Sequence, residues 1–264
     1  MLRIATWNVN SIRIRDAILS RFVREQSPDI LCLQETKVQD EHFPHDNVRA
    51  LGYTHIACVG QKSYNGVAIL SKLPLTQVEA YDVLGNNDKR HISAMLPNGL
   101  TIHNMYVPAG GDIPDTALNP KFADKLRFVE WMASWAPKAI DDKSPAILVG
   151  DLNIAPLEHD VWSHKQLLNV VSHTPVEVEA FTRAQNSIGW IDVARHFTPA
   201  NEKLYSWWSY RNRDWAASNR GRRLDHIWAT PVLRSKLSAS HIIRDARGWE
   251  STSDHVPVMM DIAL

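Results

Sequence analysis

The stretch PAILVGDLN, residues 145–153, decides the fold class of this chain. Within this stretch, a continuous apolar run is followed directly by the segment that contains Asp151 and Asn153. The stretch DILCLQ, residues 29–34, has the same character. A strand with apolar side chains on both faces must be covered on both sides. The sequence therefore predicts sheets with both faces buried and with polar residues where their strands end.

Further runs typical of strands occur along the whole chain, at 2–8, 53–59, 66–70, 91–96, 100–107, 224–229 and 255–263. Helical patterns lie between them at 13–26, 119–135 and 175–187. The Pro/Gly/Asp-rich stretch 108–120 reads as a surface loop. No internal repeat or linker divides the chain. We therefore expect one α/β domain, residues 1–264, with mixed sheets.

The composition of the 264 residues is that of an ordinary globular protein, with 22% charged and 44% hydrophobic residues. The formal net charge is zero, so any nucleic-acid site must be a local patch. Cys32 and Cys58 stand in apolar runs, and we expect reduced core residues and no disulfide. No apolar run is long enough for a membrane span and no signal peptide is visible. These features favour a cytoplasmic protein.

The strand-like runs end in residues that carry chemistry. Taken singly, each has an ordinary explanation: Asn8 could cap a helix, and the sequence GDLN could form a plain turn. Taken together, the coincidence points to a site, because strand ends are where α/β sheets bind ligands. The residues concerned are Asn8, Gln34, Glu35, Lys37, Asn104, Tyr106, Asp151, Asn153, Asp225, His226, Asp254 and His255.

In order and type these residues resemble the exonuclease III family of abasic-site endonucleases, within the metal-dependent endonuclease/exonuclease/phosphatase superfamily. The loop at 108–126 is most similar to the bacterial exodeoxyribonuclease III members. The resemblance implies a four-layer α/β sandwich, in which two packed mixed β-sheets are flanked by helices. The pieces that carry it are WNVNSIR (7–13), DILCLQETK (29–37), YNGVAILSK (64–72), NMYVP (104–108), ILVGDLNIAP (147–156), WWSYR (207–211), NRGRRLDHIW (219–228) and TSDHVPV (252–258).

The resemblance also implies a metal site. Glu35 would be the principal ligand of Mg²⁺, with Mn²⁺ as a substitute, because these ions prefer oxygen ligands. Asn8 and Asp254 would lie near the same ion. Asp151 and Asn153 would be ligands of a second ion, if there is one. The chain has no HExxH motif or close His/Cys spacing, so we expect no zinc site and read most histidines as surface or structural.

The catalytic residues implied by the resemblance act on a phosphodiester. Asp151 would activate the water or protonate the leaving group, and Asn153 would hold the water or phosphate. Tyr106 would place its hydroxyl on the phosphate. Asp225 would fix the tautomer of His255 and support its charged form. Whether Asp151 or His255 removes the proton stays open at this point.

The segment 205–228 is the candidate DNA-binding element, with five arginines, two aspartates and four tryptophans. By resemblance, Trp207 and Leu224 are walls of a pocket for a flipped-out abasic sugar, and Arg222 stands where several relatives have tryptophan. Arg211 and Arg90 are further candidates for DNA contact, and Arg90 could instead support the metal. We expect Trp208 and Trp228 to be buried, and Lys121, Lys125 and Arg127 to form a solvated helix face.

The function implied is a Mg²⁺-dependent DNA-repair nuclease of base excision repair. It would cut 5′ of abasic sites and process 3′ ends as an exonuclease and 3′-phosphatase. Its partner would be double-stranded DNA, and it would act as a monomer in the cytoplasm, associated with the nucleoid during repair. Two alternatives stay open: a phosphoesterase acting on a phosphate ester outside nucleic acids, and a DNA-binding module without catalysis.

Overall fold

Two six-stranded mixed sheets form the centre of the structure, a computed structural model that describes residues 1–141 and 143–264. The first sheet has the order β11 (Leu237–Ile242), β12 (Val258–Ile262), β1 (Leu2–Asn8), β2 (Ile30–Gln34), β4 (Tyr64–Ser71), β3 (His55–Gln61). The second has the order β5 (Thr76–Glu79), β6 (His91–Met95), β7 (Thr101–Tyr106), β8 (Ala146–Asp151), β10 (Asp225–Ala229), β9 (Ile191–Asp192). The pairs β1–β2 and β7–β8 are parallel, and the other pairs among the described residues are antiparallel.

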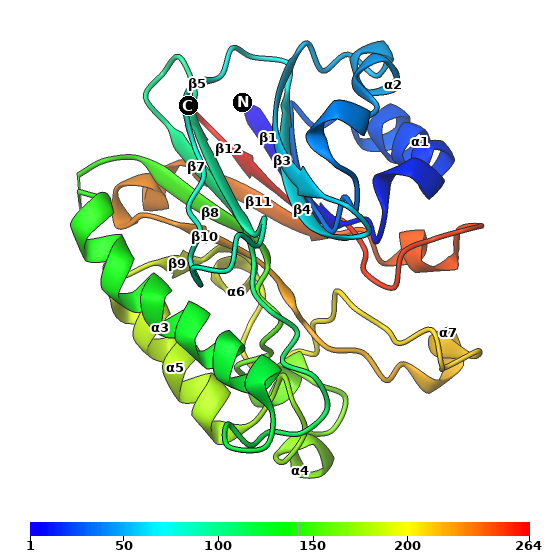
Figure 1. Ribbon diagram of the computed structural model, residues 1–264, viewed down its shortest axis with the longest axis vertical. Coiled ribbons are helices and arrows are strands. Elements are labelled where there is room, and N and C mark those ends of the chain that lie inside the picture. The colour runs from blue at the N-terminus through cyan, green and yellow to red at the C-terminus, as the bar shows by residue number, and fades with distance from the viewer. Residues whose placement is uncertain (142) are drawn as a thin grey trace.

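Helices cover the outer face of each sheet (Figure 1). On the first sheet these are α1 (Asp16–Gln26) and α2 (His45–Ala50), and on the second α3 (Pro120–Ala139) and α5 (Pro175–Asn186). No helix of the described residues has the length and apolar character needed to cross a bilayer. Shorter helices are α4 (His164–Leu167), α6 (Val193–Phe197), α7 (Trp215–Ser218), and the 3₁₀ turns η1 (Ile12–Ile14), η2 (Asp40–His42), η3 (Glu158–Asp160), η4 (Pro231–Lys236) and η5 (Arg244–Gly248).

The apolar run of β8 is explained by burial on both of its faces. Ile147 and Val149 point into the core between the two sheets. Leu148, between them in sequence, packs with residues of α3 and α5 such as Phe128 and Phe181. Alternate residues of a strand point to opposite faces, so a strand between two cores must be apolar throughout. The predicted four-layer sandwich is confirmed.

The predicted strands and helices are all present, with shifts of a few residues at their ends, and the strands that were not predicted lie at sheet edges. β5 is exposed at all its positions, and β11 is exposed at two of its six positions and half-buried at the others, so neither has the apolar pattern by which strands are recognised. β9 has only two residues. Both cysteines are free, but only Cys32 is buried, because Cys58 lies half-buried on the strand β3, at the edge of its sheet.

Candidate active site

The topology of the sheets brings the predicted site residues to one edge of the sandwich. Parallel pairing places the carboxyl ends of β7 and β8 side by side, so that Tyr106 is the register partner of Asp151. β10 runs antiparallel to β8, and its first residue, Asp225, therefore pairs with Asp151 from the other side. His255 precedes β12 and lies within reach of both carboxylates. Strand direction thus brings together Tyr106, Asp151 and Asp225, and the packing of the first sheet on the second adds His255.

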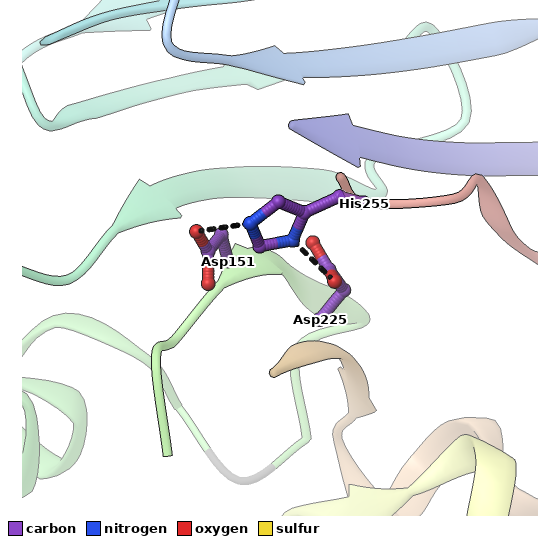
Figure 2. Close-up of side chains that lie close together, drawn as sticks. All are labelled: Asp151, Asp225 and His255. Atoms are coloured by element: carbon purple, nitrogen blue, oxygen red, sulfur yellow. Dashed lines mark hydrogen bonds and ion pairs between the residues drawn. The ribbon is translucent and has the colours of Figure 1, made fainter. Parts of the chain in front are cut away.

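His255 lies between two buried carboxylates, as Figure 2 shows. Its Nδ1 is 2.8 Å from Oδ2 of Asp225, and its Nε2 is 3.6 Å from Oδ2 of Asp151. Burial alone would lower the pKa of His255, but the charges of Asp225 and Asp151 outweigh it and raise this pKa. Burial raises the pKa of Asp151, although the charge of His255 opposes the shift. The arrangement favours a charged imidazolium that donates toward both carboxylates.

Glu35 forms the second half of the site. Its Oε1 accepts hydrogen bonds of 2.8 Å from the Asn8 amide and from the Tyr106 hydroxyl, and its Oε2 pairs with Lys37 at 2.8 Å. Burial alone would raise the pKa of Glu35, but the charge of Lys37 and these hydrogen bonds lower it. The Asn8 amide also donates to Oδ2 of Asp151 at 2.9 Å. Asn8 therefore joins the two halves directly.

The turn after β8 holds Asp151 and Asn153 in a fixed relation. The Asn153 backbone N–H donates to Oδ1 of Asp151 at 3.0 Å, and its side-chain amide donates to Oδ2 at 3.1 Å. Asn153 adopts a left-handed φ of 54°, a conformation that asparagine tolerates better than most residues. Gly150 is required before the turn, because a Cβ there would lie 1.8 Å from the Met105 carbonyl oxygen.

Asp254 lies apart from Glu35. Its Oδ2 accepts a 2.9 Å hydrogen bond from Nε1 of Trp207, and its Oδ1 accepts one of 3.4 Å from the Asn10 amide. Asn10 in turn accepts from Lys37 at 2.6 Å and donates from its backbone N–H to Oδ1 of Asn8 at 3.0 Å, so that Asn10 links Asp254 to both neighbours of Glu35. Among the described residues, no hydrogen bond or ion pair joins Asp254 directly to Glu35 or Asn8.

The donor set fits a hard divalent cation. Carboxylates outnumber cations at this edge: Glu35, Asp151, Asp225 and Asp254 are opposed there by Lys37 and His255. Oδ1 of Asp225 is buried and has no hydrogen-bond partner among the described residues. Ligand atoms of Asp151, Asp225 and His255 lie within 4.8 Å of one another, but both imidazole nitrogens already face carboxylates. Glu35, with Asn8 beside it, is the better ligand for an oxygen-seeking ion.

Several residues that complete the site were not predicted. Ser206 donates to Oδ2 of Asp225 at 2.7 Å and accepts from the backbone N–H groups of Leu224 and Asp225 at 3.0 Å. Trp7 donates from Nε1 to the His255 carbonyl at 3.0 Å. Trp7 lies in the motif WNVNSIR and Ser206 in the segment 205–228, but a buried serine or tryptophan has no sequence signal that separates support of a site from ordinary packing.

A cavity of about 690 Å³ lies next to the cluster of Asp151, Asp225 and His255. Trp207 belongs to the wall of the cavity, its Nε1 donates to Asp254, and its backbone pairs with that of His255. Arg222 and Arg211 also line the cavity, whereas Leu224 is buried in the apolar cluster behind Trp207. As predicted, Trp208 and Trp228 are buried. The remaining lining residues are Gly111, Asp112, Trp162, Val170, Val171, Ser209, Asn212, Ser218 and Arg220.

Arg90 lies inside the protein and supports Tyr106. Only 4% of it is exposed. Its guanidinium pairs with Asp88 at 2.9 Å and lies 4.8 Å from the centroid of the Tyr106 ring. Nη2 also donates to the Tyr64 hydroxyl at 3.1 Å. This position fits support of the site better than contact with DNA.

The prediction that Lys125 lies on a solvated helix face is wrong. Lys121 and Arg127 are exposed as expected, but Lys125 is fully buried. Its Nζ pairs with Glu177 at 2.5 Å and donates to the Asn153 carbonyl at 2.7 Å. The reason is tertiary: α5 packs against α3 and brings a buried carboxylate to this lysine.

Comparisons with known proteins agree with this geometry. Residues 5–255 match the model of the Endonuclease/Exonuclease/phosphatase family. The chain is 32% identical to "Exodeoxyribonuclease III" of Haemophilus influenzae, with 97% of this chain and 98% of that protein covered. It is 35% identical to the structure of an AP endonuclease from Archaeoglobus fulgidus, with a TM-score of 0.93 and 100% of both chains covered. The 3′ phosphatase NExo from Neisseria, solved with a product DNA hairpin, is 28% identical with a TM-score of 0.92, again with 100% of both chains covered. The chain therefore belongs to the Endonuclease/Exonuclease/phosphatase family.

Proposed function

We propose that this protein is a Mg²⁺-dependent DNA-repair nuclease that hydrolyses the phosphodiester 5′ of abasic sites and processes blocked or ordinary 3′ ends. The observation that carries the proposal is the Asn8 amide, which joins Glu35 to Asp151 at 2.8 and 2.9 Å. This amide joins the candidate cation site at Glu35 to the cluster of Asp151, His255 and Asp225. Hydrolysis of a phosphodiester needs both charge neutralisation and proton transfer at one place.

The side chains divide this work by position. The charged His255, held by Asp225, faces the anionic phosphate and stabilises the charge that develops on its oxygens. Asp151 is the candidate proton acceptor for the attacking water, because both nitrogens of a charged imidazole already carry protons. Tyr106 and Asn153, which both lie beside Asp151, orient the phosphate or the water. A divalent cation, Mg²⁺ or Mn²⁺, held by Glu35 and Asn8, supplies further charge neutralisation when bound.

Double-stranded DNA is the proposed partner. The wall of the cavity combines Arg211, Arg220 and Arg222 with Trp162 and Trp207, a mixture suited to a phosphate backbone and to bases or sugars that leave the stack. One of the similar structures contains a DNA hairpin. We further propose that the protein acts in base excision repair in the cytoplasm, associated with the nucleoid, as a monomer with one catalytic domain, residues 1–264.

An end-labelled duplex with one abasic-site analogue tests the proposal. With Mg²⁺ present, we expect a single cut 5′ of the analogue, and with a chelator no cut. The exposed Lys138→Ala variant, in the last turn of α3, is the control for preparation quality and should cut like the wild type. If only progressive shortening from the 3′ end appeared, the protein would be an exonuclease without cleavage at abasic sites. No cutting with either metal would contradict the nuclease, and hydrolysis of small phosphate esters would then favour the phosphoesterase alternative.

A further inference from the structure

A second cavity, of about 320 Å³, lies between the second sheet and Ala139 at the end of α3. Thr101 and Ala146 line this cavity, and they are the first residues of β7 and β8. The same two strands end at Tyr106 and Asp151 in the active site. Five residues of strand, roughly 16 Å, therefore separate the second cavity from the catalytic cluster. A ligand bound there would lie away from the scissile phosphate.

Two buried histidines beside the second cavity have a fixed order of protons. The backbone N–H of Tyr81 donates to Nδ1 of His91 at 3.2 Å, and Nε2 of His91 lies 3.3 Å from Nδ1 of His103. Burial lowers the pKa of both imidazoles, that of His103 to about 3, so both are neutral near pH 7. A neutral imidazole has one N–H. His91 therefore donates from Nε2 to His103, and His103 carries its own proton on Nε2.

His103 thus presents an N–H donor to the second cavity, which it lines with only 6% of the residue exposed. Its Nε2 has no hydrogen-bond partner among the described residues but is still accessible, unlike Nε1 of the neighbouring Trp135, which is fully enclosed. Ser93 is the register partner of His103, lines the same cavity and is 3% exposed. Its hydroxyl also remains accessible and bonds to no other residue that the structure describes. Leaving two such polar groups unpaired is costly.

Glu79 completes a row of polar groups across three strands. It is the register partner of Ser93, which in turn pairs with His103. Register partners on antiparallel strands point to the same face, about 5 Å apart. Oε2 of Glu79 accepts from the Tyr81 hydroxyl at 2.7 Å, and Oε1 has no hydrogen bond or ion pair within the described part of the chain. Serine is the shortest of the three, so a ligand over Ser93 would have an acceptor on one side and a donor on the other.

The lining of the second cavity disfavours charged ligands. None of the described residues that line it is a lysine or arginine, so a phosphate or carboxylate would find no cation and would face Glu79. A cationic ligand would leave the N–H of His103 unpaired. Met95, Ile140 and Tyr81 add apolar surface. The volume and this mixture of groups fit a small neutral heterocycle that has both a carbonyl oxygen and an N–H.

We propose that the second cavity binds an uncharged heterocycle of the kind found in nucleosides, in which a ring carbonyl accepts from His103 and Ser93 and a ring N–H donates to Glu79. The site is separate from the hydrolytic centre, and the proposal does not depend on the nuclease function. A nucleotide should bind less well than its nucleoside, because the phosphate adds negative charge near Glu79.

Isothermal titration calorimetry of the full chain with thymidine and inosine tests the proposal. We expect a dissociation constant of about 0.1–1 mM for at least one of them, the range for a ligand of this size. N3-methylthymidine and N1-methylinosine keep the carbonyls but lose the N–H, and each should bind at least about fivefold more weakly than its parent nucleoside. If neither nucleoside binds below about 10 mM, or if methylation leaves the affinity unchanged, the inference is wrong.

Three variants locate the bound nucleoside. Ser93→Ala removes the hydroxyl and Glu79→Gln removes the carboxylate with little change of shape, and each should weaken binding about 3- to 10-fold. Glu202→Gln makes the same change at an exposed position outside the lining, and should leave the dissociation constant unchanged. Thermal melts monitored by circular dichroism show that the variants are folded, whether or not the protein cuts DNA. Equal affinity in the wild type, Ser93→Ala and Glu79→Gln would place the ligand elsewhere and overturn the inference.

Discussion

Replacing Lys125 by methionine tests the buried contact on which the helix layer and the active site depend together. Nζ of Lys125 pairs with Glu177 at 2.5 Å and donates to the carbonyls of Asn153 at 2.7 Å and Ala109 at 3.3 Å. Methionine has a similar volume and shape, so the substitution removes the charge and the donors without a large cavity. The effect measured is therefore that of the polar contacts.

The loss of stability in Lys125→Met depends on how well the charge of Glu177 stays compensated once its partner is removed. Loss of one partner of a buried ion pair costs about 3–5 kcal/mol. Glu177 keeps the backbone N–H groups of Ser172 and Thr174 and the Thr174 hydroxyl, at 2.6–3.1 Å, so its charge stays partly compensated. We therefore expect a loss of unfolding free energy at the lower end of this range, about 3 kcal/mol. Such a loss lowers the midpoint of thermal unfolding by about 6–12 °C.

Circular dichroism melts and urea titrations of the wild type, Lys125→Met and Lys121→Met measure this. Lys121 lies on the same helix one turn earlier and is exposed, so its substitution should stay within about 0.5 kcal/mol of the wild type. A loss below about 1 kcal/mol for Lys125→Met would refute the reasoning. It would mean that the ammonium group is solvated, as the sequence pattern of the helix had indicated.

Three further outcomes are expected. Asp225→Asn removes the charge 2.8 Å from Nδ1 of His255 and should lower the single-turnover rate about 10²- to 10⁴-fold with unchanged circular dichroism; a loss below tenfold would contradict this. Burial lowers the pKa of His226 from 6.5 to about 4, so the unfolded chain binds the proton first as pH falls. The stability that this provides is complete above pH 6.5 and should fall by about 2–3 kcal/mol between pH 7 and 4.5. Urea titrations should show a smaller fall in His226→Gln, and an equal fall would contradict the assignment. Gly150→Ala should prevent stable folding, because its Cβ would meet the Met105 carbonyl oxygen at 1.8 Å, whereas Gly99→Ala, with open space around its Cβ, should cost about 1–2 kcal/mol; soluble expression and melting of both variants decide.

The layers of the fold could be predicted because the residues that decide them are local in sequence. The continuous apolar runs of β2 and β8 show burial on both faces, and the polar residues directly after them mark the edge where strands end. Parallel and antiparallel pairing then brings Asp151, Asp225 and Tyr106 together, as expected for α/β sheets. Resemblance supplied the number of layers, which the periodicity alone does not contain.

The contacts that could not be predicted depend on packing between distant segments. The sequence pattern of α3 places Lys125 on the surface, and only the packing of α5 against α3 makes it a buried partner of Glu177. Arg223 and Arg222 are adjacent and chemically identical, yet Arg223 is neutralised by Asp160 and Asp192, while Arg222 lines the cavity and has no ion pair among the described residues. The local pattern of an arginine-rich segment does not contain this difference.

The central claim is that Glu35, Asp151 and their neighbours form one hydrolytic centre. The most direct measurement is the single-turnover cleavage rate of the abasic duplex by Asp151→Asn, with the DNA dissociation constant measured on the same preparation. We expect the rate to fall at least about 10³-fold while the dissociation constant changes only a few-fold, because Asp151 is buried and presents little surface to the DNA. A rate equal to that of the wild type would contradict the claim, because cleavage would then not depend on Asp151.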